Sequence, residues 1–188
     1  MAFKEKNNEL KLGVKLDFST KLMMASVADA KSIVGLVNSE HYNSNAVLLV
    51  NEREMEGYIA RGWVAVAKNK EGDVVGCQGL IPWPNCGWYE FRFAVVDEAY
   101  RGQSISFKLK TMLMDKVVAG NPDAVVIGLK NASSNGFGIL ESLGLEYVPE
   151  SDIPTHVKRE VLTLGSDQEW KWYVYGYQKG FLASLVRE

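Results

Sequence analysis

Residues 96–106 read VDEAYRGQSIS, and they join a predicted β-strand to a predicted α-helix. The segment before them, 88–96, is rich in aromatic and β-branched residues, which is typical of a strand. The segment after them has apolar residues at helical spacing, which predicts a helix over 105–118. The first N–H groups of a helix have no partner within it and carry the positive end of the helix dipole. This turn therefore predicts an anion site.

The side chains of the turn suit a phosphate group. Gly102 allows the backbone to approach a ligand closely, and Arg101 adds a positive charge that matches phosphate oxygens. Ser104 and Ser106 add hydroxyl groups without bulk. Taken alone, the same residues also fit a solvated turn in which Ser104 is an ordinary helix N-cap.

The rest of the chain alternates between strand and helix patterns, which predicts an α/β fold with a mixed sheet and helices on its faces. Strands are predicted at 10–18, 22–25, 63–67, 74–81, 88–96, 124–129, 145–148 and 170–177. Helices are predicted at 26–37, 51–62, 105–118 and 134–142. The region from 151 to 164 is interpreted as a connector.

Composition limits the classes of function. With 188 residues and 47% hydrophobic content, the chain suits a single domain over residues 1–188. The net charge of −2 provides no basic field, so nucleic acid is not an expected partner. No apolar run approaches the ~20 residues that span a bilayer, and no secretory signal begins the sequence. Two cysteines without metal-ligand or disulfide spacing predict a cytoplasmic protein with no metal site.

The segment VDEAYRGQSIS resembles the cofactor motif of the GNAT superfamily of acyl-CoA-dependent N-acyltransferases, V-D-P-x-Y-R-G-x-G-[IL]-[GA]. Two further segments resemble parts of the same fold in the same order: WVAVAKNKEGDVVGCQGL (63–80) and ILESLGLEYV (139–148). The resemblance implies a GNAT fold with a mixed, mostly antiparallel sheet flanked by helices. It covers about residues 21–150 and leaves an additional strand at each end of the chain.

The resemblance implies acetyl-CoA as the co-substrate. The strand before the motif would pair with the pantetheine amides, and the loop would hold the pyrophosphate. The residues so assigned are Val95, Val96, Arg101, Gly102, Gln103, Ser104, Ile105, Ser106 and Ser134. Two features depart from the family pattern. Ser104 and Ser106 replace glycines, and Leu140 stands where many members have a tyrosine near the leaving thiolate.

Acyl transfer to an amine requires a group that removes a proton from the amine. Glu90 resembles in position the general-base glutamate of the histone acetyltransferases in this superfamily, so it is the predicted catalytic residue. The alternative is a carboxylate at a strand edge that pairs with Arg92 or a lysine.

Weaker candidates surround the expected acceptor side: His41, Trp83, Cys86, Trp88, Tyr89 and His156. The ordinary interpretation, a surface histidine or a packed aromatic ring, is favoured for each of the histidines and aromatic residues. No histidine partner is visible for a cysteine nucleophile at position 86, and direct transfer needs none.

The predicted activity is direct acetyl transfer from acetyl-CoA to a primary amine of a small molecule. Residues 48–80 and 140–154 resemble the acyltransferase domain of N-acetylglutamate synthases, although the arginine of its LLxR-type segment is missing. Arg53 or Arg61 would hold an acceptor carboxylate, unless both are solvated helix charges.

Three alternatives stay open at this point. In the first, the donor is a long-chain acyl-CoA or an acyl carrier protein. A carrier protein would require a basic surface patch near Lys108 and Lys110. Otherwise the protein binds CoA without turnover, as Leu140 and the two serines suggest. The aromatic strand at 170–177 either offers an edge for a homodimer or completes the core.

Overall fold

The computed structural model describes residues 19–44, 47, 49–84, 87–130, 138–162 and 171–176. Its strands are β1 (Lys21–Met24), β2 (Val64–Lys68), β3 (Val74–Trp83), β4 (Trp88–Val96), β5 (Val125–Lys130), β6 (Glu146–Val148) and β7 (Lys171–Tyr175). Its α-helices are α1 (Ala30–Ser44), α2 (Glu52–Ala60), α3 (Ile105–Gly120), α4 (Ile139–Ser142) and α5 (Thr155–Leu162). Short 3-10 turns occupy Val27–Asp29, Glu98–Tyr100 and Glu150–Asp152.

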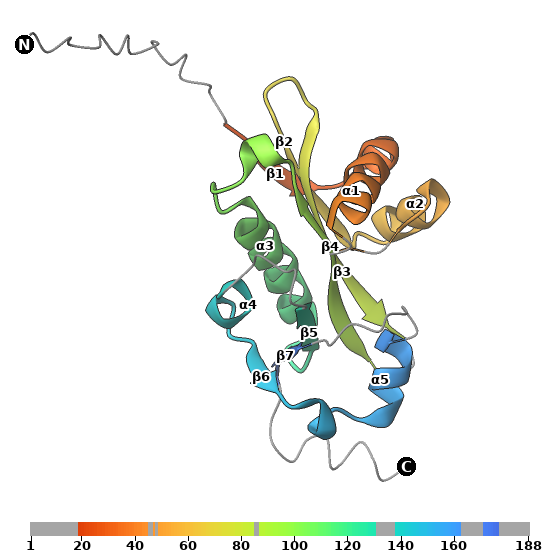
Figure 1. Cartoon of the computed structure of the whole chain (residues 1–188), viewed down its shortest axis with the longest axis vertical. Coiled ribbons are helices and arrows are strands. Elements are labelled where there is room, and N and C mark those ends of the chain that lie inside the picture. The colour runs from red at the N-terminus through yellow and green to blue at the C-terminus, as the bar shows by residue number, and fades with distance from the viewer. Residues whose placement is uncertain are drawn as a thin grey trace, which may run out of the picture.

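The seven described strands form one sheet in the order β1-β2-β3-β4-β5-β7-β6 (Figure 1). Only β4 and β5 are parallel, and every other neighbouring pair is antiparallel. The predicted mixed, mostly antiparallel sheet is therefore confirmed.

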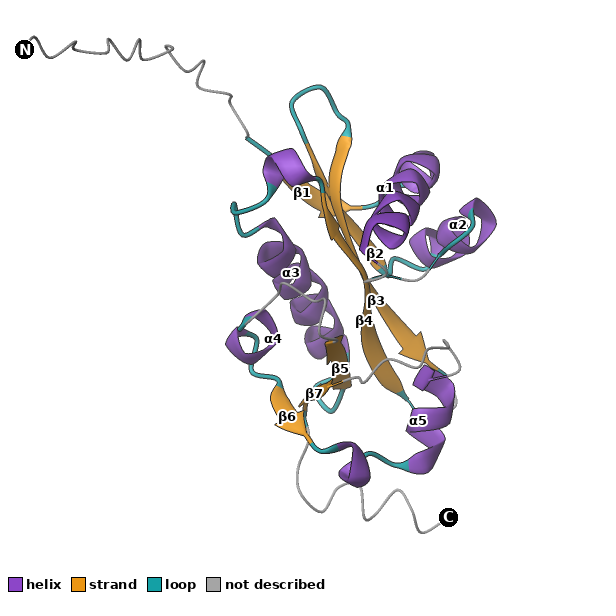
Figure 2. Ribbon diagram, in the orientation of Figure 1, coloured by secondary structure: helices purple, strands orange, loops and turns teal. Residues whose placement is uncertain are grey.

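Helices cover both faces of this sheet (Figure 2). On one face, α3 packs Leu109 and Leu113 against Leu80 of β3 and Val126 of β5. On the other face, α1 and α2 pack residues such as Ile33 and Met55 against β2, β3 and β4. Farther along that second face, Val157 of α5 packs with Trp88 and Trp172. Because successive strand residues point to opposite faces, the strands that lie between these helices are apolar on both sides.

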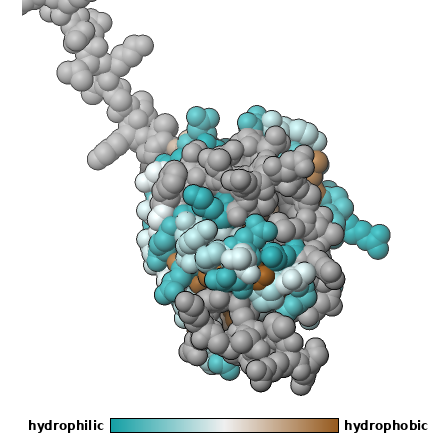
Figure 3. Space-filling model, turned by 60° about the horizontal axis from the view of Figure 1, so that its bottom comes forward, coloured by the Kyte–Doolittle hydropathy of each residue, from teal (hydrophilic) through white to brown (hydrophobic). Residues whose placement is uncertain are grey.

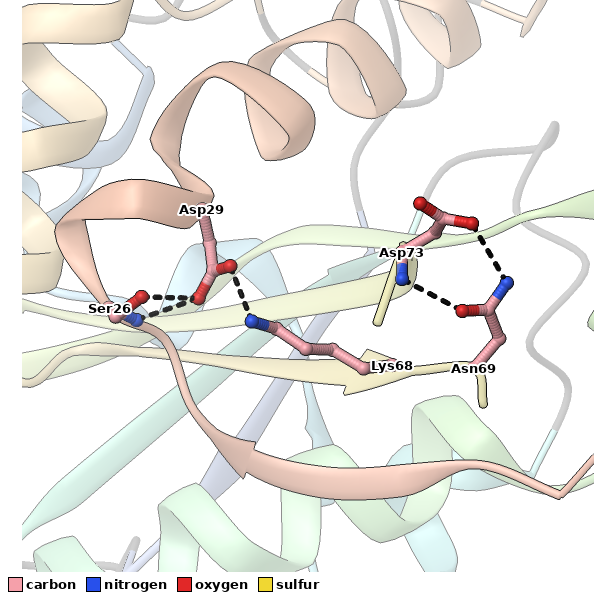
Figure 4. Close-up of polar contacts among 5 residues, drawn as sticks. All are labelled: Ser26, Asp29, Lys68, Asn69 and Asp73. Atoms are coloured by element: carbon pink, nitrogen blue, oxygen red, sulfur yellow. Dashed lines mark hydrogen bonds and ion pairs between the residues drawn. The ribbon is translucent and has the colours of Figure 1, made fainter. Parts of the chain in front are cut away.

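Two polar clusters fix the end of the sheet at the β2–β3 hairpin (Figure 4). The Asp29 carboxylate accepts hydrogen bonds from the backbone N–H and hydroxyl of Ser26, at 2.9 and 2.8 Å. It also pairs with Lys68 Nζ at 2.6 Å, which ties the start of α1 to β2. In the hairpin turn, Asn69 Oδ1 accepts from the Asp73 backbone N–H at 2.7 Å. The predicted cap at Ser26 and the predicted hairpin are both present.

Several predicted elements differ from the structure. Residues 155–162 form α5, although the sequence was interpreted as a connector there. The sequence offers only Pro154 followed by a few mixed polar and apolar residues as an indication of this helix. Eight residues are too few for a clear helical period. β3 also continues through Pro82 to Trp83. Because β2 pairs β3 only as far as Gly79, a proline beyond that point removes no hydrogen bond to β2.

The aromatic strand lies inside the sheet. β7 pairs with β5 on one side and with β6 on the other, so β6 is the edge strand. Completion of the core, with Trp172 and Val174 buried, is therefore the role of β7 in this sheet. The predicted strand at 10–18 and the first part of the predicted helix at 134–142 lie outside the described residues.

Apolar surface is dispersed. Among the described residues, the large exposed apolar side chains are Val27, Tyr42, Leu49 and Tyr147. On the face shown in Figure 3, the coloured atoms are mostly hydrophilic, with small separate apolar spots. None of the described helices has the length and apolar character that crossing a membrane requires.

Candidate active site

The parallel strands β4 and β5 separate at Glu90. They pair only at Trp88–Val125, Tyr89–Val126 and Glu90–Ile127. Beyond this point β4 pairs only with β3 and β5 only with β7, within the described residues. The facing backbone edges of the two strands therefore lack a strand partner, and buried backbone groups need one. An extended ligand with amide groups can supply the missing hydrogen bonds.

A β-bulge distorts β4 just beyond Glu90. The pairing of β3 with β4 shifts between Cys77 and Gly79, and Phe93 adopts a left-handed φ of 58°. The buried side chain of Gln78 stabilises the bulge, since its Nε2 donates to the carbonyl oxygen of Arg92 at 2.8 Å. No feature of the sequence indicates the bulge, because Phe and Ala are not typical bulge residues.

The loop after β4 has the shape that a phosphate-binding turn requires. Asp97 begins a short 3-10 turn by accepting a hydrogen bond from the Ala99 N–H at 2.9 Å. Gly102 and Ser104 then adopt left-handed backbone conformations, with φ of 80° and 59°. α3 begins at Ile105, directly after Ser104, so the unpaired N–H groups of its first turn face the end of β4.

Ser104 therefore occupies a position that favours glycine. Its side chain makes no capping hydrogen bond, so its hydroxyl does not compensate for the strained backbone. We expect Ser104→Gly to raise the free energy of unfolding by about 0.5–1 kcal/mol, because glycine adopts positive φ without a Cβ clash. Urea unfolding measures this change. Ser104→Ala is the matched control, with stability equal to the wild type, and a destabilised glycine variant would contradict the argument.

Arg101 has two partners within the protein. Its Nη2 pairs with Glu40 Oε2 of α1 at 3.0 Å, and its Nε donates to the carbonyl oxygen of Val96 at 3.1 Å. About half of the side chain is exposed. A phosphate group bound at the start of α3 would compete with Glu40 for this guanidinium.

Lys110 is buried, so it cannot belong to the basic surface patch that a carrier-protein donor would require. Its Nζ donates to Gln78 Oε1 at 2.7 Å and to Ser106 Oγ at 2.9 Å. Burial lowers the pKa of the Lys110 ammonium group to about 8. Lys110 falls on the face of α3 that packs on the sheet, which explains its burial. Of the two lysines, only Lys108 is exposed.

Glu90 lies where the strands separate, with its side chain on the face covered by α1, α2 and α5. Trp83 Nε1 donates to its Oε2 at 2.9 Å, and Arg92 Nε lies 3.9 Å from the same oxygen. Burial raises the pKa of the Glu90 carboxyl to about 7, against the opposing effects of the Arg92 charge and the Trp83 hydrogen bond. A carboxyl group of this kind can exchange a proton near neutral pH.

Comparison with known proteins identifies the fold. No protein-family model and no curated protein matches the chain. Solved structures do match. An acetyltransferase of the GNAT family from Staphylococcus aureus Mu50 superposes with a TM-score of 0.63 at 15% identity, covering 82% of this chain and 98% of that one. The fold is that of the GNAT acetyltransferases.

Two other GNAT-fold structures contain ligands. N-acetylglutamate synthase from Neisseria gonorrhoeae, in complex with coenzyme A and N-acetyl-glutamate, has a TM-score of 0.66 at 15% identity and is matched over 83% of this chain. The chain spans about a third, 34%, of that protein. Diaminobutyrate acetyltransferase from Paenibacillus lautus, in complex with L-2,4-diaminobutyric acid and coenzyme A, has a TM-score of 0.63 at 12% identity, over 86% and 98% of the two chains.

Of the other residues predicted to bind CoA, some are buried in the core and some are partly exposed beside the loop. Val95 and Ile105 are buried, and Val96 and Gln103 are half-buried at the two ends of the loop. Ser134 lies outside the described residues. Leu140 is buried on α4, within 3 Å of where a Cβ on Gly128 would lie. This position therefore supplies packing and no proton.

The weaker acceptor candidates do not gather around Glu90. Among the candidates that the structure describes, Trp83 is the one that hydrogen-bonds to Glu90, whereas Trp88 is buried in the core and Tyr89 packs on the α3 face. His41 Nδ1 lies 2.6 Å from the carbonyl oxygen of Val47, and His156 is exposed on α5. Cys86 lies outside the described residues.

The two arginines predicted to hold a carboxylate both lie on α2 or at its end. Arg53 is exposed, and Arg61 donates to the Gly57 carbonyl oxygen at 2.9 Å and lies over the Trp63 ring. Arg92, which the sequence offered only as a salt-bridge partner, is the arginine that lies beside Glu90.

Proposed function

We propose that this protein is an N-acetyltransferase that moves the acetyl group of acetyl-CoA directly to a primary amine of a small molecule. The observation that carries the proposal is the end of the β4–β5 pairing at Glu90 and Ile127. Strand β4, on one side of the opening between the two strands, leads to the loop at the start of α3. The buried carboxyl group of Glu90 lies at the point where the opening begins.

The donor fits this opening by its chemistry. Pantetheine contains amides that can pair with the facing edges of β4 and β5, beside Val95 and Val96. The pyrophosphate fits the first turn of α3, where unpaired N–H groups, Arg101 and Ser106 offer donors. The complexes of two GNAT-fold neighbours with coenzyme A support this choice of donor.

Glu90 acts as the general base. The amine nitrogen attacks the acetyl carbonyl carbon, the new C–N bond forms, and the C–S bond breaks. Glu90 takes the proton that the amine loses, directly or through water. Alignment of the two reactants supplies much of the remaining rate enhancement.

The leaving thiolate needs no protein acid in this scheme. Leu140 cannot donate a proton, but a thiol of pKa about 8.5 is acidic enough to leave as the thiolate and to be protonated by water. The carrier-protein alternative loses support, since the burial of Lys110 leaves Lys108 alone in the patch that it requires.

Calorimetric titration tests the donor, and release of thiol tests the reaction. We expect acetyl-CoA and CoA to bind with micromolar dissociation constants, and thiol to be released when amines are added. Stronger binding of a long-chain acyl-CoA would favour that donor instead. Binding without thiol release over a broad amine panel would favour the non-catalytic alternative, and no binding would contradict the proposal.

A further inference from the structure

Arg92 is, among the described residues, the cation that lies beside the proposed base. It follows Glu90 by two residues on β4, so both side chains point to the face covered by α1, α2 and α5. Its Nε lies 3.9 Å from Glu90 Oε2, which is longer than a hydrogen bond. The side chains of Arg92 and Glu90 are 11% and 5% exposed, so the pair is nearly buried but not sealed from solvent.

The donors of this guanidinium are unused within the described part of the chain. No oxygen of a described residue accepts a hydrogen bond from it, and its other neighbours are aromatic rings. The guanidinium carbon lies 5.8 Å from the centre of the Trp83 ring and 5.2 Å from that of Phe93. Aromatic rings hold an arginine in place without using its five N–H groups. These donors are left for an anion that comes from outside the protein.

The position of the pair suits the acceptor rather than the donor. The phosphate loop leads into α3, which covers one face of the sheet. Glu90 and Arg92 point to the opposite face, because Tyr89 and Phe91 alternate with them and pack on the α3 face, whereas Trp88, two residues before Glu90, packs with Val157 of α5. The two substrates would therefore reach the separation of β4 and β5 from opposite sides, and direct transfer requires that the amine and the thioester meet there.

We infer that the acceptor is an α-amino acid whose carboxylate binds Arg92 while its amine faces Glu90. This inference rests on the proposed function. An α-amino acid carries a positive and a negative group on one carbon, and the protein presents the opposite charges in the same close arrangement, 3.9 Å apart. The planar guanidinium matches a carboxylate with two parallel hydrogen bonds, which a lysine cannot provide. The carboxylate anchors the substrate and takes no part in bond making.

The test compares each amino acid with its carboxamide, which keeps the amine and side chain but removes the negative charge. Thiol release from acetyl-CoA is measured over the common amino acids and their amides. We expect the wild type to prefer the best amino acid over its amide by about 10- to 100-fold in kcat/KM, mainly through KM.

Arg92→Met should remove this preference, so that the ratio of kcat/KM for the amino acid to that for its amide falls to about 1; loss of the Arg92 charge also changes the pKa of Glu90, which affects both substrates alike and leaves the ratio as the readout. Arg92→Lys keeps the charge without the paired donors, so it should retain only part of the preference. Thermal melting followed by circular dichroism establishes that each variant is folded. Should the methionine variant fail to fold, the lysine variant carries the comparison.

Three results would overturn the inference: equal use of amino acids and amides by the wild type, an equal effect of Arg92→Met on both, or no amino acid acetylated although CoA binds. An equal effect, accompanied by a shifted pH profile, would mean that Arg92 only tunes Glu90. Failure of the wild type to bind acetyl-CoA would instead contradict the proposed function, so the two failures are distinguishable.

Discussion

Glu90→Gln should reduce acetyl transfer to amines by a factor on the order of 100 to 10,000, the range that general-base catalysis contributes. The amide keeps the shape of the carboxyl group and its contact with Trp83, but it cannot take a proton at neutral pH. The affinity for CoA should stay unchanged, because Glu90 points away from the α3 side. Single-turnover thiol release measures the rate, and calorimetry measures the affinity.

The pH dependence of the same variant checks the assignment. Because the pKa of Glu90 is about 7, the wild-type rate should rise with pH and reach half of its plateau near that pH. This step should be missing in Glu90→Gln. Glu71→Gln, in the exposed β2–β3 turn, is the matched control and should behave as the wild type. An unchanged rate in Glu90→Gln would reduce Glu90 to a buried structural carboxyl.

Stability should change in the opposite direction to activity. The pKa of Glu90 is raised in the folded protein, so the folded state binds more protons than the unfolded state between the two pKa values. The ordinary pKa of a glutamate is 4.5, and the pKa of Glu90 in the folded protein is about 7. As the pH rises through this range, ionisation of Glu90 therefore destabilises the folded wild type. Glu90→Gln removes this penalty, so it should melt above the wild type in alkaline buffer and near it in acid.

Arg101→Glu should weaken the binding of CoA by a factor on the order of 100. The substitution removes charge-assisted hydrogen bonds to the pyrophosphate and places a negative charge at the same point. The fold should persist, since the side chain is half exposed and its contacts are with Glu40 and one carbonyl oxygen. Calorimetric titration with CoA measures the loss.

Lys31→Glu is the matched control for this charge reversal. Lys31 is exposed on α1, nine residues from Glu40, or roughly 14 Å along the helix. That separation exceeds the Debye length of about 10 Å at moderate salt, so its effect on CoA binding should be small. If both reversals weaken binding equally, Arg101 acts only through the net charge and does not contact the phosphates.

The geometry of the loop between β4 and α3 was predictable because its determinants are local. The segment VDEAYRGQSIS follows a strand, precedes a helix and contains an arginine, a glycine and small residues. Backbone sterics within these few residues restrict the turns that they can adopt. The left-handed backbone of Ser104 also explains why the family motif has a glycine at this position. The α/β fold class followed from hydrophobic periodicity for the same reason.

The tertiary structure decided what depends on how distant segments pack. The burial of Lys110 follows from the rotation of α3 on the sheet, which brings it to Gln78, 32 positions earlier in the chain. The short helix α5 is stabilised by the packing of Val157 on Trp88 and Trp172. Propensity within its own eight residues is too weak to indicate it.

Glu90 shows the division most clearly. The sequence determined its place on a strand before the cofactor motif, because strand and motif are contiguous. It did not determine that β4 leaves β5 at this residue, or that burial raises its pKa. Nor did it show that Arg92 lies beside it without a hydrogen bond to any described oxygen. Strand pairing and desolvation are properties of several elements packed together, so only the tertiary structure could show them.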